Sequence, residues 1–182
     1  MTVDWKSWVE SVAACVASVP DETLKLAADF IRKSTIVITA GNGGSASLAS
    51  HAAQAIAKPS YGPNGGLAAV CLTDHVPTLT AHANDGSWDD AMVNSAMPFL
   101  RTGCTLVVFS SSGRSANVCK LARLVAADAT RTVIAFTGFD GNPLRGLATI
   151  PIHVPSHDYE VVEPVHEALM HRVQYHIRES SP

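Results

Sequence analysis

Two short loops rich in glycine and serine follow apolar runs, and each opens a segment with helical periodicity. The first loop reads GNGGSAS (41–47) and the second reads SSSGRS (110–115). A helix N-terminus presents unpaired N–H groups that favour an anion, glycine lets the backbone approach a ligand, and serine hydroxyls add donors. The serines of the second loop therefore favour a phosphate or polyol site over a role limited to capping their own backbone. They are Ser110, Ser111, Ser112 and Ser115.

The first loop also satisfies the pattern G-x-G-x-x-A, which occurs in dinucleotide-binding turns. Such proteins carry an acidic residue for the ribose about 20 positions further on. Here that stretch reads PSYGPNGG, and neither loop carries the lysine of a P-loop. We therefore do not expect the loop to bind a dinucleotide.

Histidine and glutamate residues near the first loop and near the C-terminus are candidates for metal binding and proton transfer. His51 follows the first loop, while Glu163, Glu167 and His171 are spaced i, i+4, i+8 along one helix face. The ends of that ladder lie about 12 Å apart along the helix axis, so Glu167 is the easier geometric partner of His171. The segment HEALMH is not a zincin motif, because Met170 stands where the second histidine would be needed. The alternative to metal binding is that these side chains are ordinary solvent-exposed charged groups on one face of a helix.

The elements that position these residues alternate strand and helix after two leading helices, expected at 3–19 and 21–33, with Asp21 placed to cap the second. The strands read as continuous apolar runs, which indicates strands covered on both faces in a parallel sheet. We predict one α/β domain over 1–182, a three-layer sandwich. The expected strands are 35–40, 67–72, 104–110, 131–137 and 149–154, and the further helices are 45–57, 87–99, 115–127 and 158–179.

Composition excludes several other classes. The chain of 182 residues is 47% hydrophobic and 16% charged, with a net charge of −3 and no basic block, so we expect no nucleic-acid partner. No apolar run is long enough to span a bilayer, and we predict no membrane partner and a cytoplasmic location. The four cysteines are far apart in apolar segments, which is typical of buried thiols in a reducing compartment.

The motifs GNGGSAS…H, SSSGRSANV and TGFDGNPL, with a histidine-bearing C-terminal helix, resemble the SIS (sugar isomerase) domain family. Within it, the chain is most similar to the phosphoheptose isomerases, which interconvert sedoheptulose 7-phosphate and a heptose 7-phosphate. The resemblance implies a five-stranded parallel sheet and a homotetramer with active sites at subunit interfaces, in which residues 1–33 take part in oligomer packing. It also implies a ketol isomerase that works through an enediol with a bound Zn²⁺ ion.

Position by position, the resemblance also implies which residues form the site. Metal ligands would be His51, Glu163 and His171, and the last two would also transfer protons. Substrate contacts would come from the two loops, an asparagine–aspartate pair and one further acid: Asn42, Gly43, Gly44, Ser45, Asn84, Asp85, Ser110, Ser111, Ser112, Ser115 and Glu160.

The chain departs from the family pattern at two positions. The glutamate expected one turn after His51 is Ala55, and the glutamine expected eight positions before His171 is Glu163. We therefore expect Glu163 to be a relocated base or metal ligand, and Glu167 is the alternative carboxylate partner of His171. Two alternatives remain open: an isomerase for a sugar of another chain length, and a non-catalytic sugar-phosphate-binding or replication-initiator-associating regulatory protein.

Overall fold

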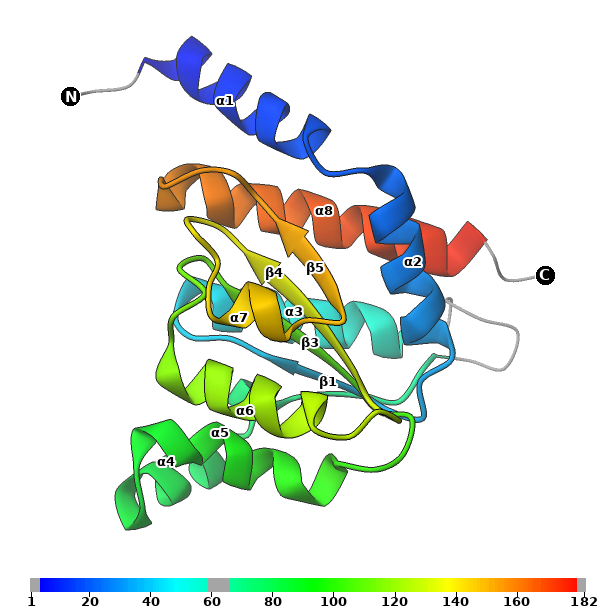
Figure 1. Cartoon of the computed structure of the whole chain (residues 1–182), viewed down its shortest axis with the longest axis vertical. Coiled ribbons are helices and arrows are strands. Elements are labelled where there is room, and N and C mark those ends of the chain that lie inside the picture. The colour runs from blue at the N-terminus through cyan, green and yellow to red at the C-terminus, as the bar shows by residue number, and fades with distance from the viewer. Residues whose placement is uncertain (1–3, 59–65, 180–182) are drawn as a thin grey trace.

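A sheet of five parallel strands runs through the middle of the protein, in the order β2-β1-β3-β4-β5 (Figure 1). The computed structural model describes residues 4–58 and 66–179. The predicted α/β sandwich with a five-stranded parallel sheet is confirmed, and the predicted strands differ from the observed ones by a few residues at their ends. The strands are β1 (Val37–Ala40), β2 (Ala69–Cys71), β3 (Thr105–Ser110), β4 (Thr132–Thr137) and β5 (Ile150–His153).

The sheet is covered on both faces, as its continuous apolar strands predict. Every residue of β1, β3 and β4 is buried, because parallel strands of this type have helices on each side. On one face Phe109 and Phe136 stack with their ring centroids 4.7 Å apart, and on the other Leu106 packs with Met92 and Leu121. These two core clusters fix which helices form each outer layer.

One layer contains α2 (Asp21–Arg32), α3 (Gly44–Ala57) and α8 (Tyr159–Glu179). The other contains α5 (Trp88–Ala96), α6 (Ala116–Ala126) and α7 (Leu144–Leu147), with α4 (Val76–Asp85) packed on α5 (Figure 1). Helices α4 and α7 were not predicted from the sequence. Among the described residues, none of the helices combines the length and apolar character needed to cross a bilayer.

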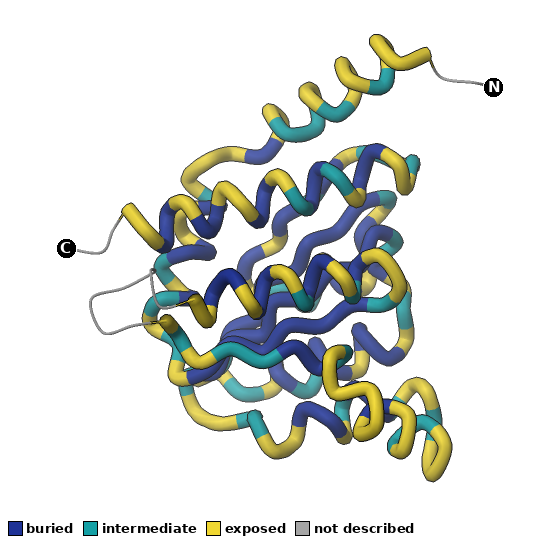
Figure 2. The backbone as a smooth tube through the Cα atoms, turned by 180° about the vertical axis from the view of Figure 1, so that it is seen from behind, coloured by how far each residue is buried: buried dark blue, intermediate teal, exposed yellow. Residues whose placement is uncertain are grey.

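Helix α1 (Trp5–Ala17) lies at one end of the molecule and has no buried residue, as its yellow and teal trace shows (Figure 2). The Trp8 indole N–H donates a hydrogen bond of 3.1 Å to the backbone carbonyl of Glu160 in α8. Pro164 lies four residues further along α8 and has no N–H, so the helix itself cannot satisfy this carbonyl. The proline thus creates the acceptor that anchors α1 to α8.

The predicted capping role of Asp21 is wrong. Pro20 is the N-cap of α2, and the Asp21 carboxylate instead binds α8. It accepts hydrogen bonds of 2.7 and 2.8 Å from Arg172 and lies 3.0 Å from His176 Nε2. Long-range ion pairing outcompetes the local cap here, and the bonds to Arg172 hold the pKa of Asp21 well below its ordinary value.

We expect Asp21→Asn to lower the melting temperature at pH 7, because Arg172 and His176 lose their anionic partner. The depressed pKa means that the carboxylate contributes fully above about pH 4 and loses its effect as the pH falls further. Thermal unfolding from pH 7 to pH 2.5 should therefore show wild type and variant converging on the acid side. Glu22→Gln, an exposed acid on the same turn, serves as the control. Equal melting temperatures at pH 7 would contradict this assignment.

Candidate functional site

Two pockets adjoin near the carboxyl ends of β1 and β3, where ligands bind in open parallel sheets. They share Gly44, Ser45 and Glu163. We call the smaller one, of about 260 Å³, the serine pocket, and the larger one, of about 390 Å³, the histidine pocket. The serine pocket is further lined by Asn42, Gly43, Phe109, Ser110, Ser111, Ser112, Ser115 and Tyr159. The histidine pocket is further lined by Ser47, Leu48, His51, Pro164, His166 and Glu167.

The serines of the second loop lie in the serine pocket without the capping bonds that the alternative interpretation requires. Ser115 is the N-cap of α6, yet its side chain makes no cap hydrogen bond. The hydroxyl of Ser111 is buried and has no partner among the described residues. Only Ser112 makes a local bond, accepting from the N–H of Arg114 at 3.3 Å. Unpaired hydroxyls beside a helix N-terminus favour an anionic ligand.

The first loop is fixed to the second by a pair of amide side chains. Asn42 and Asn117 donate to each other, with N···O distances of 2.9 and 3.1 Å, and Asn117 is buried. The Asn117 side-chain oxygen also accepts from the N–H of Val118 in the first turn of α6. Asn117 thus positions both walls of the serine pocket. Asn117 belongs to the motif SSSGRSANV, but its role could not be predicted from the sequence because its partner lies 75 positions away.

Glu163 lies where the two pockets meet. Its carboxylate packs against the backbone of Gly44 at the start of α3, where an added Cβ would be only 2.6 Å from Glu163 Oε2. Gly43, the N-cap of α3, has a φ of +54° that disfavours any other residue. The glycines of the first loop therefore leave room for this carboxylate as well as shaping the turn.

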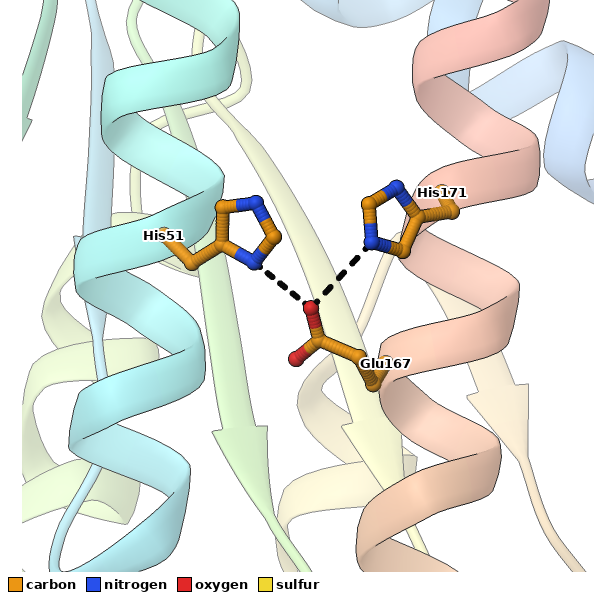
Figure 3. Close-up of side chains that lie close together, drawn as sticks. All are labelled: His51, Glu167 and His171. Carbon is orange, nitrogen blue, oxygen red and sulfur yellow. Dashed lines mark hydrogen bonds and ion pairs between the residues drawn. The ribbon is translucent and has the colours of Figure 1, made fainter.

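His51, Glu167 and His171 converge on one another from α3 and α8 (Figure 3). Glu167 Oε1 lies 2.6 Å from His51 Nδ1 and 3.4 Å from His171 Nε2. One ligand atom from each residue lies within 4.8 Å of the others, and all three side chains are partly exposed. Glu163, predicted as the carboxylate ligand, is not part of this cluster. The carboxylate in the cluster is that of Glu167, the predicted alternative.

The residues present fit a divalent metal ion. Two imidazoles and one carboxylate are a donor set of catalytic zinc sites, in which the fourth position stays open for water or substrate. Ligand atoms about 2.0–2.2 Å from a tetrahedral ion lie roughly 3.3–3.5 Å apart. The separation between Glu167 and His171 already falls in that range, and the shorter one to His51 would have to widen slightly.

His166, which precedes Glu167 on α8, forms part of the wall of the histidine pocket. It is buried against Phe136, with ring centroids 5.8 Å apart, and its Nε2 has no partner in the described part of the chain. Burial lowers its pKa to about 4, so the imidazole is neutral at physiological pH. A neutral imidazole can stay buried in the pocket wall without a charged partner. In the sequence His166 stands out only as the first residue of HEALMH, which does not match a zincin motif.

Three predicted substrate contacts lie outside both pockets. Asn84 and Asp85 are exposed at the end of α4, where the Asn84 amide donates to the Asp85 carboxylate at 3.0 Å. Glu160 is exposed in the first turn of α8. Within one copy of the chain none of these residues reaches the serine or histidine pocket, so their contact with substrate remains a prediction.

The fold and the pockets define an α/β protein that binds small ligands at the carboxyl edge of a parallel sheet. A family model described as the SIS domain matches residues 7–138, and the chain therefore belongs to the SIS-domain family. The matched region includes both loops and His51 but ends before α8, so the family match does not cover Glu163, Glu167 or His171.

Several known proteins are similar to the chain. The phosphoheptose isomerase of Shewanella sediminis is 34% identical over 138 residues, which cover 74% of this chain and 70% of the relative. The lincomycin biosynthesis protein LmbN of Streptomyces lincolnensis is 37% identical over 139 residues, 72% of this chain, but the match spans only 50% of LmbN. These matches agree with the predicted similarity to phosphoheptose isomerases.

Solved structures show the same fold along nearly the whole chain. The phosphoheptose isomerase GmhA of Neisseria gonorrhoeae superposes with a TM-score of 0.85 at 27% identity, covering 96% of this chain and 95% of that one. A phosphoheptose isomerase of Francisella tularensis also gives a TM-score of 0.85, at 22% identity and with 97% and 95% coverage. This second likeness supports the fold alone.

Proposed function

We propose that the protein is a phosphosugar ketol isomerase that converts sedoheptulose 7-phosphate, or a related long-chain ketose phosphate, to the aldose phosphate. The observation that carries the proposal is the shared wall of the two pockets. A sugar whose phosphate occupies the serine pocket would present its carbonyl end to Glu163 and the histidine cluster. The phosphoheptose isomerases among the relatives support this substrate class.

In the proposed reaction, the serines of the second loop and the first turn of α6 hold the phosphate. Glu163 removes a proton from C1 of the ketose, the carbonyl becomes a hydroxyl as the C1–C2 double bond forms, and the same carboxylate returns the proton to C2. A second acid–base group moves the hydroxyl proton, and the family resemblance gives this role to His171. A zinc ion held beside these residues would polarise the carbonyl oxygen as a Lewis acid.

We also infer that the chain assembles with copies of itself, as the predicted tetramer with interfacial active sites requires. Large apolar side chains are exposed on the two leading helices: Trp5, Val9, Leu26 and Phe30. Trp5 is 75% exposed, which is unusual for so large an apolar side chain. An assembly would cover these side chains and would also give Asn84 and Asp85 a route to a neighbouring pocket. The cytoplasmic location remains a prediction.

The proposal is tested by incubating the zinc-loaded protein with sedoheptulose 7-phosphate and following the sugar by proton NMR. We expect new anomeric proton signals from an aldose phosphate, which the ketose cannot give because its anomeric carbon carries no hydrogen. No conversion with zinc or other divalent ions would contradict the proposal and favour the non-catalytic alternative. Conversion of only a shorter ketose phosphate would overturn the substrate but not the reaction type.

A further inference from the structure

We propose that two carboxylates on consecutive turns of α8 divide the work at this site. Glu167 is the metal ligand, with His51 and His171, and Glu163 is left free as the base. The assignment of Glu163 rests on the proposed isomerase function, whereas the assignment of Glu167 rests on geometry alone. The roles of metal ligand and base, both predicted for Glu163 from the sequence, are thereby divided between two residues.

The geometry of the cluster argues for Glu167 as the ligand. One oxygen, Glu167 Oε1, faces a nitrogen of each histidine, at 2.6 and 3.4 Å (Figure 3). The imidazole rings lie edge to face with their centroids 5.1 Å apart, so the two histidines are direct neighbours across α3 and α8. A single carboxylate oxygen between two imidazole nitrogens is what a shared ion would require of these side chains.

Within residues 4–58 and 66–179, no other carboxylate joins the cluster from the side of α3. Ala55 lies one turn beyond His51 on α3 and is buried, with 4% of its surface exposed. Glu167 reaches the same imidazole from α8, across 116 positions of sequence. The carboxylate is therefore supplied by the facing helix instead of by the helix that carries His51.

Glu163 is held apart from the cluster and toward the serine pocket. Its carboxylate lies against Gly44, and it is the one acid that lines both pockets among the described residues. The base must reach C1 and C2 of the ketose, at the end of the sugar remote from the phosphate and beside the oxygen that an ion would polarise, and Glu163 lines the histidine pocket as well as the serine pocket. An imidazole that binds an ion through Nε2 has no electron pair left on that atom to take a proton from carbon, which leaves Glu163 to move the carbon-bound proton in the loaded protein.

The test compares two matched variants, Glu167→Ala and Glu163→Ala, neither of which removes a buried side chain. Zn²⁺ affinity is measured by competition with a metallochromic chelator, and circular dichroism checks that both variants fold. We expect Glu167→Ala to weaken Zn²⁺ binding at least ~100-fold, since even changes in residues behind metal ligands weaken binding 10–100-fold. We expect Glu163→Ala to change it less than ~3-fold, because its carboxylate lies outside the cluster. His51→Ala is the positive control and should resemble Glu167→Ala.

Loss of Zn²⁺ binding in Glu163→Ala but not in Glu167→Ala would overturn the assignment. Equal effects in both variants, or no Zn²⁺ binding by the wild-type protein, would overturn it as well. The metal measurement needs no substrate, so it is independent of the isomerase assay. If the wild-type protein binds Zn²⁺ through Glu167 but converts no ketose phosphate, the proposed function fails while the ligand assignment stands.

Discussion

Replacing Glu163 by glutamine should lower the turnover of the phosphosugar by about 10²–10⁴-fold, the usual contribution of a positioned general base. The amide keeps the shape of the side chain but cannot accept a proton from carbon. Because the carboxylate lies at the junction of the two pockets and outside the histidine cluster, we expect KM and metal content to stay close to wild type. Steady-state kinetics with a metal determination would measure all three quantities.

Gly44→Ala tests the position of the same carboxylate without changing its chemistry. The added Cβ would lie 2.6 Å from Glu163 Oε2, so the carboxylate must move. Displacement of a catalytic group by about 1 Å can lower the rate roughly 100-fold. Glu22→Gln, a distant exposed acid on α2, is the control that should keep the wild-type rate.

Full activity in Glu163→Gln would exclude Glu163 as the base.

Ser111→Ala should raise KM for the phosphosugar by about 10–100-fold with no loss of stability, since a hydrogen bond to a charged group contributes about 1.5–3 kcal/mol. Ser111 lines the serine pocket, and its hydroxyl is buried and has no partner among the described residues. Its removal therefore breaks no bond in the free protein, and it eliminates an unpaired polar group. We expect the melting temperature to stay the same or to rise slightly.

Ser95→Ala provides a matched control for this variant. Ser95 lies in α5, and its hydroxyl is likewise buried and unpartnered in the described part of the chain, but it lines neither pocket. The same chemical change there should leave KM unaltered. A KM for Ser111→Ala equal to that of wild type and Ser95→Ala would show that the serine pocket does not hold the phosphate.

The sequence allowed the sheet and the serine pocket to be predicted because their signals are local. Continuous apolar runs indicate buried parallel strands, and Gly43 with the serines after β3 marks the turns that open α3 and α6. The two loops are then expected to lie close together, because the carboxyl ends of parallel strands share one edge of the sheet.

Contacts between residues far apart in the sequence could not be predicted in the same way. The bond between Asn42 and Asn117 and the contact between His51 and Glu167 depend on how helices pack, and no spacing along the chain encodes either one. Asp21 was expected to cap α2, but an arginine far along the chain binds it. Glu167 was recognised as the easier partner of His171 from helix geometry, whereas family resemblance directed attention to Glu163.

The most direct test of the account is the conversion of sedoheptulose 7-phosphate in D₂O by the zinc-loaded protein, followed by NMR. A base that moves a proton through an enediol exchanges it with solvent, so the aldose phosphate should carry deuterium at C2, and Glu163→Gln should abolish both product and exchange. Absence of product and of exchange in the wild-type protein, or unchanged exchange in Glu163→Gln, would contradict it.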